Sequence, residues 1–152
     1  MDYVLNFDCE DLKVKLSNMS VSCYGATGLF DFDYHFDIKI EDVKANTLIK
    51  QKFEDDISEL ISFCKGGDSL KSVQNDCILK IFLDDSKNSS NVEPCMILNF
   101  ETKNLRFNKK IGYCKESVED FKLELKSIYE SLIEQYIKEH PDKNCTITKV
   151  KF

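Results

Sequence analysis

The sequence predicts an α+β fold, in which an antiparallel sheet of about seven or eight strands carries two amphipathic helices. Three observations support this class. Residues 30–40 alternate without interruption between apolar and polar side chains, as a strand with one buried face does. The apolar period becomes helical between residues 53 and 64, and again over residues 117–139. We expect one domain over residues 1–152, since chains of this length usually fold as a single unit.

The first quarter of the chain predicts strands of a meander, because its apolar residues alternate in short runs. These residues are Leu5, Phe7 and Cys9, then Leu12, Val14 and Leu16, then Met19, Val21 and Cys23. Gly25 and Gly28 indicate a turn before the long strand, since glycine adopts positive φ without steric cost. A second turn is expected at Glu41–Asp42, and a short strand within residues 44–52.

A first helix is expected over residues 54–65. The acidic residues 54–56 would occupy its first turn, where the helix dipole favours negative charge, and Gly66 and Gly67 would end it. Strands are then expected at residues 76–83, 95–100 and 105–113, with a polar loop at residues 84–93. The apolar stripe that predicts the helix consists of Phe53, Ile57, Leu60, Ile61 and Cys64.

A second helix is expected over residues 117–139, with Ser117 as its capping residue and Pro141 beyond its end. Tyr129, Tyr136 and Ile137 lie off its main apolar stripe, and two roles remain open for them: a wider core contact or a homo-oligomer surface. Residues 145–152 are expected to form a closing strand or an extended tail. The predicted core consists of Phe30, Phe32, Tyr34, Phe36, Ile38, Leu79, Ile81, Phe121, Leu125, Ile128 and Leu132.

Composition limits the classes of function. The net charge is −6 and there is a single arginine, which argues against binding a nucleic-acid backbone. The seven cysteines form no Cys-x-x-Cys pair, and the N-terminal segment lacks a basic and then apolar leader, so we expect a reduced, cytoplasmic protein. No apolar run is long enough for a membrane helix.

The polar face of the long strand supplies the candidate site, which consists of Asp31, Asp33, His35 and Asp37. Carboxylates on a rigid sheet could dock a basic partner, or Asp33 and His35 could form a metal or catalytic site, or the face could simply be solvated. The basic run Arg106–Lys110 contains Phe107 and could suit single-stranded nucleic acid. The sequence contains no phosphate-binding loop or zinc spacing, and we expect no cofactor, no metal and no catalytic residues.

The layout of a meander, a short helix, further strands and a closing helix resembles the WapI-type immunity proteins of bacterial polymorphic-toxin systems. The resemblance depends on residues 53–63, on Ile78–Phe82 and on residues 118–122, and it is one of spacing. It implies a non-enzymatic acidic protein that binds and blocks a toxin.

We therefore expect a non-enzymatic binding protein that neutralises a basic protein partner through the acidic strand face. One alternative is an inhibitor, encoded by a phage or mobile element, of a host defence complex. Another is an enzyme of unrecognised type that uses His35 with Asp33 or Asp37.

Overall fold

The computed structural model describes residues 3–9, 12–24, 31–66, 69–74, 76–84, 95–103, 106–112 and 115–140. Side chains are described at these positions except 7–9, 24, 31, 83–84, 95–97, 107–112 and 115–120. The predicted α+β class is confirmed: the described residues form eight antiparallel strands and two helices. The strands are divided between two four-stranded sheets, whereas the sequence suggested a single sheet.

Sheet A has the order β1-β2-β3-β4, and its strands are Leu5–Cys9, Leu12–Tyr24, Asp31–Asp42 and Thr47–Asp56. The second and third apolar runs of the sequence belong to one strand, β2, and their apolar residues change from even to odd positions. A β-bulge between Ser17 and Ser20 accommodates the change, with Asn18 at a φ of 52°. Val14, Leu16 and Met19 therefore all point to the buried face.

The turn between β3 and β4 differs from the expectation. Strand β3 continues through Glu41–Asp42, and the turn follows at Val43–Asn46. The Asp42 carboxylate is buried and accepts a hydrogen bond of 3.1 Å from the Ala45 amide, while Asn46 adopts a φ of 49°. An acceptor side chain that begins a turn and an asparagine at positive φ are both common in tight turns.

Helix α1, Ile57–Cys64, begins later than predicted. Residues 54–56, expected in its first turn, are the end of β4, and Asp56 is the residue that caps the helix. The Asp56 carboxylate accepts a hydrogen bond of 2.8 Å from the Ser58 amide. The apolar positions Ile57, Leu60 and Phe63 are buried, as the helical spacing requires.

Sheet B has the order β5-β6-β7-β8, and its strands are Ser69–Gln74, Cys77–Asp84, Cys95–Glu101 and Arg106–Gly112. Strand β5 lies beside β4, the edge strand of sheet A, and its side chains hydrogen-bond to backbone groups of β4. The Ser72 hydroxyl donates to the Lys52 carbonyl, and the Gln74 side-chain oxygen accepts from the Lys52 amide at 3.1 Å. Gln51 also donates to the Cys77 carbonyl at 3.2 Å, which joins the two sheets further.

Helix α2, Lys115–Glu139, starts two residues before the predicted Ser117 and ends where expected. Its residues Tyr129 and Tyr136 pack edge-on against Tyr34 and Phe32 of β3. Ile137 is also packed against the core, so the core role is the one that the structure supports for these three residues. Pro141 and residues 145–152 lie outside the described residues.

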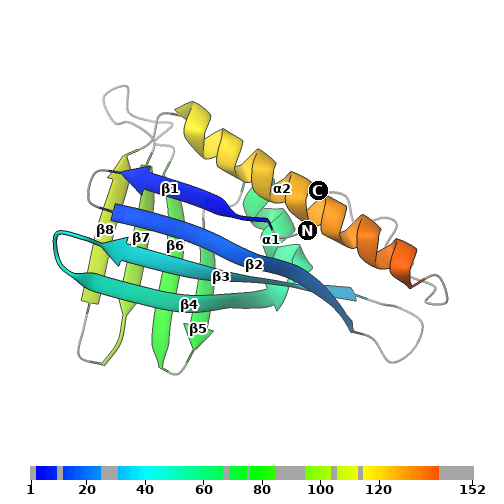
Figure 1. Ribbon diagram of the computed structural model, residues 1–152, viewed down its shortest axis with the longest axis horizontal. Helices are drawn as coiled ribbons and strands as arrows, with labels where there is room; N and C mark the ends of the chain where they lie inside the picture. Colours follow the sequence, from blue (N-terminus) through cyan, green and yellow to red (C-terminus); the bar gives the residue numbers. More distant parts are fainter. Residues whose placement is uncertain are drawn as a thin grey trace.

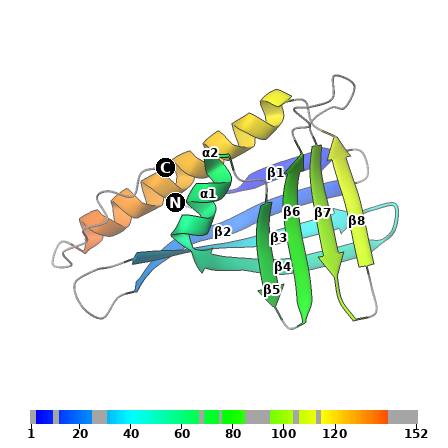
Figure 2. The same cartoon turned by 180° about the vertical axis from the view of Figure 1, so that it is seen from behind.

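The two sheets cross at a steep angle, and both helices lie on the same side of sheet A as sheet B (Figures 1 and 2). The inner face of sheet A is therefore covered by sheet B at one end and by the helices at the other. The predicted core residues are buried, except that Leu132 is only partly buried and Phe30 is not described. Within the described residues, neither helix has the length and apolar character needed to span a membrane.

Candidate functional site

The outer face of sheet A is turned toward the viewer in Figure 1, and none of the described elements covers it. The odd residues of β3 point to this face, because successive side chains of a strand alternate. Cross-strand register then decides their neighbours. Along β3 the acidic residues and His35 are followed by Lys39 and then Glu41, and Lys39 is flanked by lysines of β2 and β4. The face is therefore not uniformly acidic.

Three lysines lie side by side across the middle of this face. Lys15 of β2 pairs with Lys39 of β3, which pairs with Lys50 of β4. We call these three residues the lysine row; all three are exposed. Like charges directly opposite one another in a sheet are destabilising, and in the described part of the chain none of the three forms an ion pair. Three adjacent ammonium groups without an ion pair among the described residues are suited to an anionic ligand.

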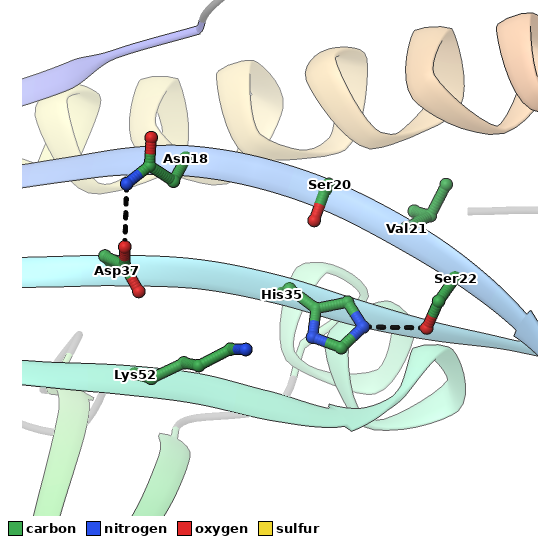
Figure 3. A pocket seen from close by; sticks show the side chains of 7 residues that line it. All are labelled: Asn18, Ser20, Val21, Ser22, His35, Asp37 and Lys52. Atoms are coloured by element: carbon green, nitrogen blue, oxygen red, sulfur yellow. Dashed lines mark hydrogen bonds between the residues drawn. The ribbon is translucent and has the colours of Figure 1, made fainter.

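A pocket of about 350 Å³ opens on the same face, next to the lysine row. Its lining side chains come from β2, β3 and β4 (Figure 3). Asp37 and Lys52 of the pocket lie on β3 and β4, two residues along from Lys39 and Lys50, which corresponds to about 6.6 Å. The lining residues are Asn18, Ser20, Val21, Ser22, His35, Asp37 and Lys52.

The β-bulge of β2 explains why the face is hollow at this point. It brings Asn18 out of the regular ladder, and the Asn18 amide donates a hydrogen bond of 2.8 Å to the Asp37 carboxylate (Figure 3). Beyond it, Ser20 and Ser22 have small side chains opposite the larger His35 and Asp33. The pocket is therefore a consequence of the local backbone irregularity and of the short hydroxyl side chains.

His35 is held firmly at one end of the pocket. Its Nε2 is hydrogen-bonded to the Ser22 hydroxyl at 2.7 Å, and its Nδ1 lies 3.5 Å from a Glu54 carboxylate oxygen. Its side chain is 15% exposed. The backbone carbonyl of His35 accepts a hydrogen bond of 2.6 Å from the Tyr129 hydroxyl of α2, which fixes the strand from its buried side.

Acidic residues gather beyond His35. Partial burial raises the pKa of the Asp33 carboxyl above its ordinary value. The neighbouring charge of His35 lowers this pKa, whereas the carboxylates of Asp56, Glu54 and Asp55 raise it further. The outer face of sheet A thus has an acidic end and a basic middle, with the pocket between them.

The structure brings Asp33, His35 and Asp37 onto one face, as the alternation predicts. Asp31 lies on β3 opposite Tyr24, and its side chain is not described. The assignment of these four residues to a partner site stays a prediction. Sequence reasoning missed the lysine row, Ser22 and Glu54, since cross-strand pairing between distant segments brings them together.

The contacts of His35 differ from those that the enzyme alternative proposes. Its ring nitrogens are directed at Ser22 and Glu54, and Asp37 accepts a hydrogen bond from Asn18, while Asp33 interacts with His35 through charge. In the part of the chain that the structure describes, no group of three or more His, Cys, Asp or Glu side chains could hold a metal ion.

Three solved plant structures are similar to this chain over most of its length. A structure of the plant transcriptional regulator PBF-2 has a TM-score of 0.53 and 13% identity, over 94% of this chain and 87% of its own. WHY1 from Arabidopsis thaliana has a TM-score of 0.57 and 11% identity, over 90% and 93%. WHY3 from the same plant has 0.55 and 9%, over 91% and 94%. No family model and no curated protein matches the sequence.

These similarities correct the expected function. The expectation of an immunity protein or inhibitor that neutralises a basic protein partner is wrong, because the structures that share this fold include a plant transcriptional regulator and the WHY1 and WHY3 proteins. The layout resemblance to WapI-type proteins stays untested. At 9–13% identity, the comparisons show that this chain has the fold of PBF-2, WHY1 and WHY3.

Proposed function

We propose that this protein binds nucleic acid on the outer face of sheet A, and that it does so without enzymatic activity. The observation that carries the proposal is the lysine row, in which Lys15, Lys39 and Lys50 stand on three adjacent strands of an open surface. Regulation of transcription is a nucleic-acid function, so the shared fold with a transcriptional regulator supports the same reading.

The net charge of −6 argues against nucleic-acid binding only if the charge is spread evenly, and here lysines and carboxylates gather at different places on sheet A. Backbone phosphates respond to the local potential, which is screened over about 8 Å at physiological salt. Neighbouring strands are about 4.8 Å apart, so the Cα atoms of the row span roughly 10 Å. Lys13 and Lys52 are exposed on the same face but add little net charge, because Lys13 lies opposite Glu41 and the Lys52 ammonium lies 3.9 Å from a Glu54 carboxylate oxygen.

The basic run Arg106–Lys110 is a weaker candidate. It forms most of β8, at the edge of sheet B. Arg106 lies 3.2 Å from the Glu101 carboxylate, which neutralises part of its charge. The lysine row lacks such a carboxylate neighbour among the described residues, so we place the phosphate contacts there.

The proposal is tested by replacing the row with glutamines in the triple variant Lys15→Gln, Lys39→Gln and Lys50→Gln. Fluorescence anisotropy with labelled single-stranded and double-stranded oligonucleotides should show binding by the native protein and a large loss in the variant. For a single strand, the slope of log affinity against log salt should become shallower by about 2, since each phosphate contact contributes about 0.7.

A matched control changes three exposed lysines elsewhere, in the triple variant Lys44→Gln, Lys65→Gln and Lys138→Gln. Its net charge equals that of the test variant, so a general charge effect would lower both affinities alike. Equal losses in the two variants, or an unchanged affinity in a folded lysine-row variant, would contradict the proposed surface.

We further propose a cytoplasmic location, a single domain over residues 1–152, and a layout that resembles WapI-type proteins. The transcriptional regulator among the similar structures is in keeping with a non-enzymatic protein.

A further inference from the structure

The pocket beside the lysine row has walls of mixed character. The Asp37 carboxylate accepts hydrogen bonds, the Lys52 ammonium donates them, and the hydroxyls of Ser20 and Ser22 can do either. The His35 ring lies along one side (Figure 3). A phosphate would meet the negative charge of Asp37, whereas a flat molecule with both donors and acceptors could satisfy all of these groups.

A nucleobase has this chemistry. Proteins commonly hold an unstacked base by stacking it on an aromatic ring, histidine included, and by hydrogen bonds to its polar edges. The position of the pocket also suits a base, because it lies about two residues along the strands from the ammonium groups that would bind the backbone. Phosphates over the lysine row would leave one base directed at the pocket.

The nucleic acid that places a base in this pocket must be single-stranded. Bases in a duplex are stacked and paired, and extruding one costs a few kcal/mol. A single strand presents unpaired bases without that cost. The acidic end formed by Asp33, Glu54 and Asp56 repels phosphates, so the backbone would run across the strands of sheet A over the lysine row.

Asp37 gives the pocket a preference among bases. One of its carboxylate oxygens accepts from Asn18, and the lone pairs that remain can only accept. Adenine, cytosine and guanine carry an exocyclic amino group that can donate to this carboxylate. Thymine and uracil instead present carbonyl oxygens on either side of one N–H, and these oxygens would face the negative charge.

We propose that this pocket takes one unstacked base of a single-stranded nucleic acid and prefers bases with an exocyclic amino group. This inference rests on the proposed function, because the lysine row is taken to hold the backbone.

The test compares the affinities of the full chain for labelled oligo(dA), oligo(dC) and oligo(dT) of equal length. We expect oligo(dT) to bind more weakly by roughly tenfold, within the range that one good polar pair to a base supplies. The Asp37→Asn variant should lose this discrimination while still binding, because a carboxamide can present either a donor or an acceptor.

A second variant, Ser20→Leu, fills the pocket without changing any charge. It should also remove the discrimination while the salt dependence of binding stays that of the native protein. Circular dichroism and thermal unfolding of both variants establish that they are folded. Lys44→Gln, in the turn after β3, serves as a control that should leave discrimination intact.

The outcomes separate the inference from the function on which it rests. If the three oligonucleotides bind equally, or if both pocket variants keep the discrimination, the pocket proposal is wrong while nucleic-acid binding stands. If none of the three oligonucleotides binds, the pocket proposal and the proposed nucleic-acid binding are both wrong. If free CMP or AMP binds as tightly as the matching oligonucleotide, the pocket takes a mononucleotide, and the strand-binding proposal is overturned.

Discussion

At the scale of single residues, the clearest link between the core and the candidate site is Tyr129. Its ring is fully buried against Tyr34, and its hydroxyl donates to the His35 carbonyl at 2.6 Å. The strand segment that carries His35 on the outer face is thereby fixed from the inner face. Burial also raises the pKa of the Tyr129 hydroxyl, so it remains a hydrogen-bond donor at any physiological pH.

Removing this hydroxyl should destabilise the protein. In Tyr129→Phe the ring still fills its site, but the His35 carbonyl loses a buried donor, so we expect the free energy of unfolding to fall by about 1–2 kcal/mol. Urea denaturation followed by circular dichroism measures the change. Tyr3→Phe is the control, because no hydrogen bond of Tyr3 is seen among the described residues. Equal stability of Tyr129→Phe and the native protein would contradict the role assigned to the hydroxyl.

Asp33 should make stability depend on pH in the opposite sense to most carboxylates. Its pKa is raised in the folded state, chiefly by burial, so the native protein keeps the proton over a range where the unfolded chain has lost it. The free energy of unfolding contributed by Asp33 therefore falls as pH rises through that range, and the deficit persists at neutral pH.

Asp33→Asn should accordingly stabilise the protein at pH 7 by up to ~0.5 kcal/mol, since the site is partly solvated. The gain should disappear in acid, where both states of the native residue are protonated. Thermal unfolding at a series of pH values measures it, with the exposed Glu134→Gln as reference. A gain that grows as the pH is lowered would show that the sign is wrong.

At the scale of secondary-structure elements, the bulge of β2 determines the surface of sheet A. Asn18 adopts a φ of 52°, a conformation that glycine and asparagine tolerate and β-branched residues do not. Asn18→Val should therefore cost about 1–3 kcal/mol, whereas Asn18→Gly should lose only the exposed hydrogen bond to Asp37. Urea denaturation of the two variants measures the contrast. Comparable stabilities would mean that the bulge relaxes without strain.

At the scale of the whole molecule, helix α1 joins the parts of the core. It contacts β3 and β4 of sheet A, β5 of sheet B, and α2. Leu60→Ala removes a fully buried side chain from this junction and should cost about 2–5 kcal/mol. Hydrogen exchange followed by mass spectrometry should then show protection falling in peptides of β3 and β6 together.

The exposed Leu123→Ala on α2 is the matched control, because it removes the same atoms from a side chain that is 59% exposed. If β3 loses protection in Leu60→Ala while β6 keeps it, the two sheets unfold separately, and the single-domain expectation is wrong.

Local pattern was sufficient for much of the fold. Alternation identified the buried face of β3, and helical spacing identified the apolar faces of α1 and α2. The predicted start of α1 is too early. Acidic residues suit both a first helical turn and the exposed end of a strand, and residues 54–56 are strand because they pair with β3. The division into two sheets depends on which strands pair, and no local period encodes this.

The candidate site was less predictable for the same reason. Asp33, His35 and Asp37 come from one strand, so alternation was enough to place them together. Lys15, Lys39 and Lys50 are separated along the chain and become neighbours only through register. Their charge was counted in the net value of the chain, where it is hidden by a larger number of acids.

Side chains of β5 hydrogen-bond to β4 at the edge of sheet A, and this affects whether another chain can add to the sheet. An unpaired strand edge is a template on which a second chain can add a strand, and such additions lead to aggregation. Ser72 and Gln74 occupy the Lys52 amide and carbonyl, which blocks this growth along the middle of β4. Extension of sheet A by another chain is therefore hindered at this point of β4, whereas none of the other described strands pairs with the outer edge of β1.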